Sequence, residues 1–272
     1  MPPTATTTDH GRERLGRALA FERAMKAAFG RTVTAEWGQA FLRPDLARFH
    51  DGNLLWIRGD GQLDAAAIDA EAERLLGGAG LPYRRCVCEE PAESRTAPGL
   101  AELGYRAARH VLMAHAGPPP DAPATPVHET GVDAVLPGIE RYLLTDPDAT
   151  YGRDDECRAH LLEHSRAYGA SVRERAFVIE RDAEPVAWAL LWSRDGVAQI
   201  DEVVCLAEHR GHGYGRAAVS AAARAALAEE PELLFLVADA EDWPQHLYAR
   251  LGFEPIGHRG LHHRDVAVAG AA

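Results

Sequence analysis

A glycine-rich turn between a predicted strand and a predicted helix constrains the fold more than any other segment. The strand spans 197–206, and an alanine-rich helix follows over 215–228. The sequence that joins them is Arg210-Gly211-His212-Gly213-Tyr214-Gly215. Alternate glycines let the backbone approach a ligand and direct N–H groups toward it, and the helix N-terminus adds partial positive charge. We therefore predict a pyrophosphate site here, to which Arg210 and Arg216 add full charges.

Other interpretations of this turn are weighed against that one. A P-loop ends in Gly-Lys-Ser/Thr, which this turn lacks. A dinucleotide fingerprint fits formally on Gly213, Gly215 and Ala218, with Asp239 ending the next strand where a ribose-binding acid would lie. Only one strand–helix–strand unit is present, however, and the roughly 30 residues left are too few for such a domain. A glycine turn without a ligand stays as the structural alternative.

The elements predicted around the turn indicate a mixed α/β domain. They are, in order, helices 134–144 and 154–168, strands 176–181, 185–193 and 197–206, helix 215–228, strand 233–237, helix 242–251 and a strand after Gly252. Turn signals at 181–184 and 194–196 separate the first three strands. These strands are therefore predicted to form an antiparallel meander.

A proline-rich stretch divides the chain. Five prolines over 117–126 predict an extended, semi-rigid linker. We predict an N-terminal α/β domain over 11–116 and a C-terminal domain over 127–268. The elements predicted in the first half are helix 12–30, strand 54–57, helix 64–76 and a strand at 85–87.

A short echo links the two halves. Residues 100–105 and 247–253 share a Leu-Gly-aromatic pattern that predicts a helix, a glycine cap and an aromatic residue entering a strand. Two related domains in tandem would produce this echo. Chance would also produce it, because many helices end in this way.

The loop and a second signature together resemble the GNAT acetyltransferases. The family's loop pattern, Arg/Gln-x-x-Gly-x-Gly/Ala, and its pattern Leu-Tyr-x-x-x-Gly-Phe fall on Arg210, Gly213 and Gly215 and on Leu247, Tyr248, Gly252 and Phe253. The resemblance covers about 127–268 and implies a GNAT fold, with a mixed α+β sheet, for the C-terminal domain. Together with the echo, it leads us to interpret the smaller N-terminal domain as a degenerate GNAT-like copy.

The resemblance also implies a reaction and its residues. Acetyl-CoA would be the cosubstrate, held at its pyrophosphate by residues 210–216. A strand bulge before the loop would present backbone groups of Val203, Val204 and Cys205 to the thioester carbonyl and pantetheine. An amine of a small-molecule acceptor would attack directly, and Tyr248 would protonate the departing thiolate. Packing beside its helix neighbours is the alternative role for Tyr248.

The sequence leaves more than one residue open as the general base. Glu202, at the start of the predicted bulge, is the candidate base. Adjacent strand residues point to opposite faces, so only one of Asp201 and Glu202 can face the cleft. A solvated acid at the strand edge is the alternative for either. The sequence also departs from the family at Glu241 and Pro244, where Asn and Ala are common, and this puts a cofactor contact in doubt.

Charge and composition narrow the partners. Residues 1–126 carry 16 acids and 15 Lys+Arg, whereas 127–272 carry 25 and 14, so nearly all of the net charge of −12 lies in the second half. This disfavours nucleic acid and favours a cationic amine. The longest dense apolar stretch, 186–192, is far shorter than the roughly 20 residues of a membrane span. Without a signal-peptide pattern, a cytoplasmic monomer or homodimer is expected.

No metal site is expected from the sequence. Cys86 and Cys88 are interpreted as core residues on one face of a strand, because no second pair supplies further ligands. His258, His262 and His263 fit no closed-site spacing and are interpreted as surface residues. The four cysteines suggest no disulfide framework. A second hypothesis for the whole chain is a non-catalytic acyl-CoA-binding or regulatory module, which the Glu241 departure motivates.

Overall fold

The computed structural model describes residues 9–59 and 63–266. Contacts divide the chain into two compact units. Unit 1 consists of Met1–Met25, Leu112–Ala238 and Trp243–Gly257, and unit 2 of Lys26–Val111, Asp239–Asp242 and His258–Ala272. The mixed α/β class predicted from the sequence is confirmed. Among the described residues, no helix is both long and apolar enough to span a membrane.

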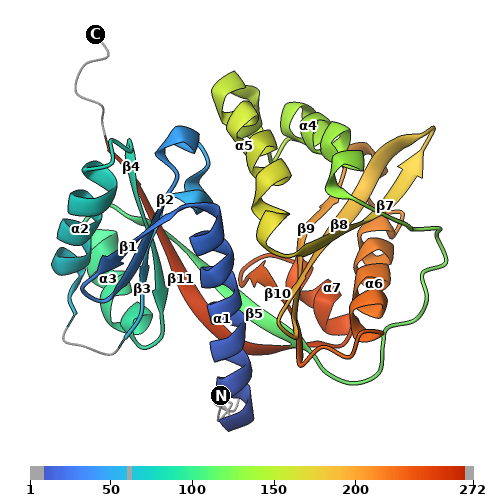
Figure 1. The fold of residues 1–272 in the computed structure, drawn as a ribbon, viewed down its shortest axis with the longest axis horizontal. Helices are drawn as coiled ribbons and strands as arrows, with labels where there is room; N and C mark the ends of the chain where they lie inside the picture. The colour runs from blue at the N-terminus through green and yellow to red at the C-terminus, as the bar shows by residue number, and fades with distance from the viewer. Residues whose placement is uncertain (1–8, 60–62, 267–272) are drawn as a thin grey trace. The chain divides into compact units, whose positions relative to one another are not determined.

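Five neighbouring strands of the protein's sheet form the centre of unit 1 (Figure 1). Their order is β6 (His128–Thr130), β7 (Arg173–Arg181), β8 (Glu184–Arg194), β9 (Val197–Cys205) and β10 (Leu233–Asp239). The first four strands pair antiparallel, and β10 pairs parallel with β9. Positive φ angles at Asp182, Ala183, Asp195 and Gly196 form the two tight turns. The predicted meander is therefore confirmed.

Helices cover this sheet on both of its faces. The helices of unit 1 are α1 (Asp9–Phe29, which continues into unit 2), α4 (Leu136–Thr145), α5 (Asp155–Ala167), α6 (Tyr214–Leu227) and α7 (Pro244–Arg250). The alanine-rich face of α6 is buried and packs against β8 and β9, because small side chains let the helix approach the strands closely. On the opposite face, Gly138 of α4 lies against the ring of Trp188 from β8.

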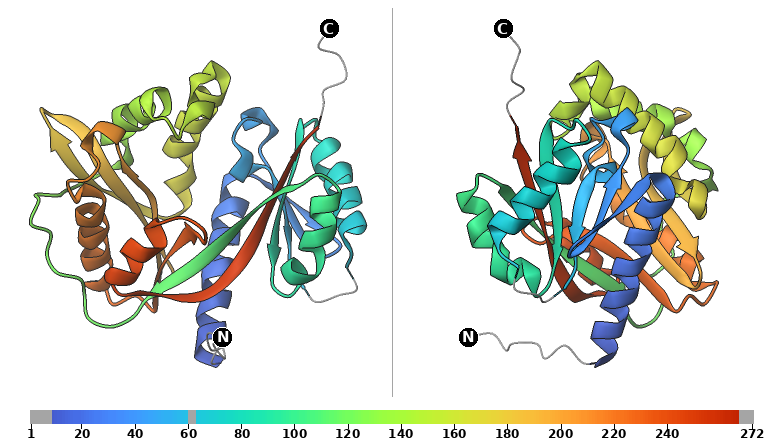
Figure 2. Two further views of the ribbon diagram at one scale, coloured as in Figure 1. Left: turned by 180° about the vertical axis from the view of Figure 1, so that it is seen from behind. Right: turned by 60° about the vertical axis from the view of Figure 1, so that its left-hand side comes forward.

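Another run of neighbouring strands in the sheet belongs to unit 2. Its order is β1 (Arg31–Ala35), β2 (Gly38–Leu42), β3 (Leu54–Ile57), β4 (Tyr83–Glu89) and β11 (Phe253–Asp265), of which β11 begins in unit 1. β3 and β4 are parallel, and the other neighbours are antiparallel. Its helices are α2 (Ala65–Ala72), which continues as a π turn over Glu73–Gly77, and α3 (Ala92–Glu102) (Figure 2). Their apolar side chains form one buried core with strand residues such as Leu55, Ile57 and Cys86.

Two strands belong to both units. β5 (Arg106–His115) passes from unit 2 into unit 1 after Val111, and β11 passes from unit 1 into unit 2 after Gly257. The compact units therefore differ from the predicted domain ranges at both ends of the chain. The N-terminal helix belongs mainly to unit 1, and the last strand ends in unit 2. The predicted linker, 117–126, contains no helix or strand.

The echo between the two halves corresponds to the same local structure twice. In one copy α3 ends before Gly104 (φ +85°) and β5 follows; in the other α7 ends before Gly252 (φ +89°) and β11 follows. A positive φ after the last helical residue lets the final carbonyl groups of the helix find hydrogen-bond partners, and glycine adopts this φ with little steric cost. A degenerate copy as its origin stays a prediction. The strands β1, β2 and β6 were absent from the sequence-based prediction.

The packing of α4 on β8 yields a stability prediction. A Cβ added to Gly138 would lie 2.8 Å from Cζ3 of Trp188 and 3.0 Å from Cγ of Pro185, and both neighbours are rigid. We expect Gly138→Ala to lower the free energy of unfolding by about 1–3 kcal/mol. The control is Gly16→Ala in α1, where an added Cβ meets nothing within 4 Å. It should raise that free energy by roughly 0.5–1 kcal/mol in the same urea titration. Equal effects of the two variants would contradict this packing.

Candidate functional site

The pairing of two parallel strands in unit 1 ends partway along their length. Residues 197–200 of β9 pair with 233–236 of β10. Past Ile200 and Leu236, within the described residues, β9 and β10 continue without pairing to each other. Backbone N–H and C=O groups on this side of β9 are therefore available to a ligand. The parallel pair of β9 and β10 therefore opens after Ile200 and Leu236.

A β-bulge interrupts the other edge of β9 at the same level. Trp188 of β8 is opposite Val204 and Leu190 is opposite Asp201, so two steps on β8 match three on β9. Glu202 has a φ of +45°, in the left-handed region that a non-glycine residue rarely adopts. The predicted bulge is present, and its extra residue lies just before Val204. A rarely adopted backbone conformation is strained and persists only where surrounding contacts hold it, and such residues are concentrated at functional sites.

Asp201 fixes the backbone at this bulge. Its Oδ1 accepts the Glu202 N–H at 2.7 Å, and its Oδ2 accepts Nε2 of the buried Gln199 at 2.6 Å. The expectation that only one of the two acids can face the cleft assumed a regular strand. The register shift between them removes the basis for that expectation.

Glu202 lies in an environment that disfavours its charge. Burial raises the pKa of Glu202 to about 8, and the charges of Asp201 and Glu174 act in the same direction. Glu174, on β7, accepts a hydrogen bond of 2.6 Å from Trp192 Nε1, and burial also raises its pKa. Three carboxyl groups thus share one part of the sheet. A cation placed there would relieve their repulsion.

The glycine turn follows directly. Gly211 and Gly213 have φ angles of +82° and +76°, so the turn needs residues without a side chain there. A Cβ added to Gly211, Gly213 or Gly215 would meet nothing within 4 Å, so this side of the turn is open. Gly213 is the N-cap of the 14-residue helix α6, and no side chain caps it. The first N–H groups of the helix are therefore left for an anion.

The charged residues around the turn divide into two groups. Arg210 is held by carboxylates, because its guanidinium contacts Asp146 at 2.8 Å and Asp148 at 3.3 Å. Arg216 is exposed and forms no ion pair among the described residues. The sequence-based prediction missed Arg181, at the turn between β7 and β8. Its guanidinium lies 4.7 Å from the centre of the Tyr214 ring and donates to the Tyr214 hydroxyl at 3.1 Å.

The remaining loop side chains pack on one another. The rings of His212 and Tyr214 stack with their centres 5.5 Å apart, and Nδ1 of His212 lies 3.0 Å from the Arg210 carbonyl oxygen. Cys205, the last residue of β9, is half-buried, and its carbonyl oxygen accepts a bond of 3.3 Å from Arg210 Nε. Arg210 therefore ties the end of the strand to the acids after α4.

Tyr248 lies on α7, which runs beside β10 (Figures 1 and 2). Its side chain is buried, with 7 % exposed, and its ring meets that of Phe253 edge-on at 6.4 Å. Tyr248 therefore packs against Phe253. Its role as the acid and the alternative of packing alone both stay predictions.

One interpretation of the histidines is wrong. His262, expected at the surface, is fully buried, because its strand is covered in unit 2 by helix α3, from which Glu93 contacts it. His258 and His263 are half-buried, and burial lowers the pKa of each. Cys86 and Cys88 are both fully buried in the apolar cluster of unit 2, as expected of core residues.

A family model described as the acetyltransferase (GNAT) family matches residues 141–253. The predicted resemblance of the C-terminal half to the GNAT acetyltransferases is thereby confirmed over this range. The matched range contains the bulge, the glycine turn and Tyr248. No curated protein matches this chain in sequence.

Solved structures show the same fold over most of the chain. A functionally unknown conserved protein from Staphylococcus epidermidis is similar with a TM-score of 0.66 at 14% identity, covering 88% of this chain and 95% of that one. A GCN5-related N-acetyltransferase from Kribbella flavida is similar with a TM-score of 0.56 at 19% identity, covering 91% and 94%. A GCN5-related N-acetyltransferase from Sphaerobacter thermophilus is similar with a TM-score of 0.51 at 15% identity, covering 74% of this chain and 67% of that one. At these identities, the likeness concerns the fold alone.

The pKa of Glu202 yields a prediction about stability. In the folded chain Glu202 keeps its proton up to about pH 8, whereas the unfolded chain releases it near its ordinary value of 4.5. The unfolded state therefore binds fewer protons over this interval, so this group lowers the free energy of unfolding as the pH rises. Glu202→Gln has no such proton to release. We expect its stability relative to the wild type to increase from pH 5 to pH 8 and then level off.

Urea unfolding at a series of pH values checks this, with the exposed Glu184→Gln as a control that should show no such trend. Parallel stability curves for Glu202→Gln and the wild type would show that the carboxyl group is not held in an unfavourable environment.

Proposed function

We propose that unit 1 transfers an acetyl group from acetyl-CoA to the primary amine of a small cationic acceptor. The observation that supports this most is the continuous segment 201–216. In it, a strand released from pairing on one edge and bulged on the other leads directly into an open glycine turn at a helix N-terminus. The match of residues 141–253 to the acetyltransferase family supports the same reaction class.

The donor would bind along this segment. The N–H groups at the start of α6 and in the turn would hold the pyrophosphate, and the open space at the three glycines would admit it. Arg216 and Arg181 would supply charge, because neither is held by a carboxylate among the described residues. Arg210 would act mainly by fixing the turn, since its guanidinium is already held by Asp146 and Asp148.

The thioester would lie at the unpaired part of β9. Backbone N–H groups of residues 203–205 would polarise its carbonyl as charge develops on the oxygen. The amine nitrogen would attack the carbonyl carbon, the new C–N bond would replace the C–S bond, and the thiolate would leave. Tyr248 would give that thiolate its proton, which is modestly uphill from a phenol and therefore depends on positioning.

The acceptor would be recognised by the carboxyl groups around the bulge. Glu202, Asp201 and Glu174 form an acidic part of the sheet, which attracts an ammonium group. That ammonium must lose a proton before it attacks, and a carboxylate with a pKa of about 8 is a suitable base near neutral pH. Glu202 is therefore assigned as the general base, acting directly or through a water molecule.

Donor binding is tested by calorimetry with acetyl-CoA. We expect the wild-type chain to bind one equivalent, and the double variant Arg181→Ala/Arg216→Ala to bind it about tenfold or more weakly, because two charge-assisted contacts are lost. Arg194→Ala, at the turn between β8 and β9, is the matched control and should bind as the wild type does. Absence of binding at millimolar acetyl-CoA would refute the donor.

Catalysis is tested by following thiol release over a panel of amines at varied pH. Because only the carboxylate form of Glu202 accepts a proton, kcat should rise with pH through about 8. Glu202→Gln should lower kcat roughly 100-fold and remove that rise. Tyr248→Phe should lower kcat with little change in acetyl-CoA binding. Tight binding of acetyl-CoA without thiol release from any amine would favour the non-catalytic module instead.

A further inference from the structure

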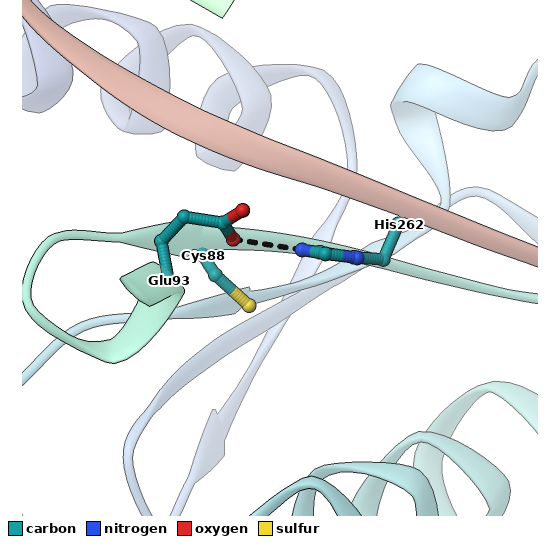
Figure 3. Close-up of side chains that lie close together, drawn as sticks. All are labelled: Cys88, Glu93 and His262. Atoms are coloured by element: carbon teal, nitrogen blue, oxygen red, sulfur yellow. Dashed lines mark hydrogen bonds and ion pairs between the residues drawn. The ribbon is translucent and has the colours of Figure 1, made fainter. Parts of the chain in front are cut away.

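Three side chains with metal-binding atoms meet inside unit 2, and none of them takes part in the proposed acetyl transfer (Figure 3). Cys88 comes from β4, Glu93 from the first turn of α3 and His262 from β11. One ligand atom of each lies within 4.8 Å of the other two. Cys88 and His262 are fully buried, and the side chain of Glu93 is 15 % exposed. Three different elements therefore converge on one enclosed point.

The sheet is shaped to receive this group. Cys88 pairs with Gly260 across the β4–β11 ladder, and His262 lies two residues farther along β11, so both face the same side. A Cβ at Gly260 would fall on the carboxylate of Glu93, with which it would clash. The absence of a side chain at Gly260 thus makes the space into which Glu93 descends from α3. Core packing of a cysteine does not require a glycine opposite it or a carboxylate in the space that the glycine leaves.

The polar atoms of the cluster are incompletely satisfied. His262 Nε2 lies 2.7 Å from Glu93 Oε2, as the dashed line in Figure 3 shows. Within the described part of the chain, the other ring nitrogen, Nδ1, is buried without a hydrogen-bond partner. Burying an unpaired polar atom costs free energy, and in this arrangement the described residues satisfy only one of the two ring nitrogens.

Two other roles for the cluster fit less well. Nucleophilic catalysis by Cys88 requires an accessible thiol that hydrogen-bonds to the histidine, but Cys88 is fully buried and Nδ1 has no partner among the described residues. A plain His–Glu pair explains the 2.7 Å contact but not the thiol beside it.

The donor set suits a borderline divalent cation. Thiolate, imidazole and carboxylate are the three ligand types of protein zinc sites. One thiolate and one carboxylate also balance two positive charges, so the occupied site would carry no net charge in a buried position. In a tetrahedral site, nitrogen and oxygen ligands lie roughly 3.3 Å apart. Insertion of the ion would therefore need only a small outward movement of the Glu93 carboxylate.

We propose that Cys88, Glu93 and His262 bind a divalent transition-metal ion of the Zn²⁺ type, with a fourth position open to water. The ion would join β4, α3 and β11 in unit 2. It is independent of the acetyl transfer proposed for unit 1, and each can fail without the other.

The test uses the tag-free full chain, stripped with a chelator and titrated with Co²⁺ as a spectroscopic probe and then with Zn²⁺. We expect one equivalent of Co²⁺ to produce a thiolate-to-metal charge-transfer band, and one equivalent of Zn²⁺ to abolish it. Cys88→Ser should lose the band. Glu93→Gln keeps a hydrogen-bonding group for His262 and should bind Zn²⁺ at least about tenfold more weakly. Cys157→Ala removes another buried thiol, from unit 1, and should leave the titration unchanged.

Thermal unfolding gives a readout that does not depend on a band. Zn²⁺ should raise the Tm of the wild type and of Cys157→Ala, and it should raise that of Glu93→Gln much less. Circular dichroism before the titration shows whether each variant is folded. The proposal is overturned if the folded wild type gives no charge-transfer band and no Zn²⁺-dependent change in Tm. An unchanged band and Zn²⁺ affinity in Cys88→Ser and Glu93→Gln would overturn it as well.

Discussion

The site in unit 1 depends on the loss of regular pairing along the second half of β9. One edge of β9 separates from β10 after Ile200. The other edge is interrupted by the bulge, where Asp201 and Val204, three residues apart on β9, lie opposite residues only two apart on β8. Free backbone groups in a folded protein must find partners, and inside a sheet they normally find them in the neighbouring strand. Among the described residues, β10 does not pair with these groups, and the chain runs from them into the N-terminus of α6. The positive φ of Glu202 and the bracing bond from Asp201 show how the local sequence maintains this irregularity.

The electrostatics of the site follow from the same irregularity. The bulge brings a half-buried glutamate close to two other acids, and burial with like charge raises its pKa into the range useful to a base near neutral pH. A few residues farther along, the turn has the opposite character, with N–H groups, a helix N-terminus and two arginines that carboxylates do not hold among the described residues. One segment thus presents an acidic surface for a cation and a donor-rich surface for a phosphate.

Local features of the sequence predicted much of the fold. The glycine turn, the meander and the helices around it follow from periodicity and turn residues within a few positions of one another, and the structure contains them. Short strands such as β1 and β6 were missed, because three to five residues carry little periodicity and their pairing depends on distant partners. Arg181 was missed for a related reason, since only the fold places it on Tyr214.

The cluster of Cys88, Glu93 and His262 in unit 2 is a clearer example of contacts between distant residues that the sequence does not predict. Spacing along the chain gave no reason to join Cys88 and Glu93 to His262, which lies 169 residues after Glu93. His262 was expected at the surface because its spacing from His258 and His263 fits no closed metal site, and the covering helix α3 could not be inferred from that spacing. The expectation that only one of Asp201 and Glu202 can face the cleft lost its basis for a different reason, because strand alternation holds only until a bulge interrupts the strand.

Hydrogen–deuterium exchange with and without acetyl-CoA tests the central claim most directly, because it reports on the backbone N–H groups themselves. If segment 201–216 is the donor site, acetyl-CoA should slow exchange in peptides that cover 203–206 and 211–217, and leave peptides that cover 83–102 unchanged. Protection that appears only outside 201–216, while acetyl-CoA is bound, would contradict the account.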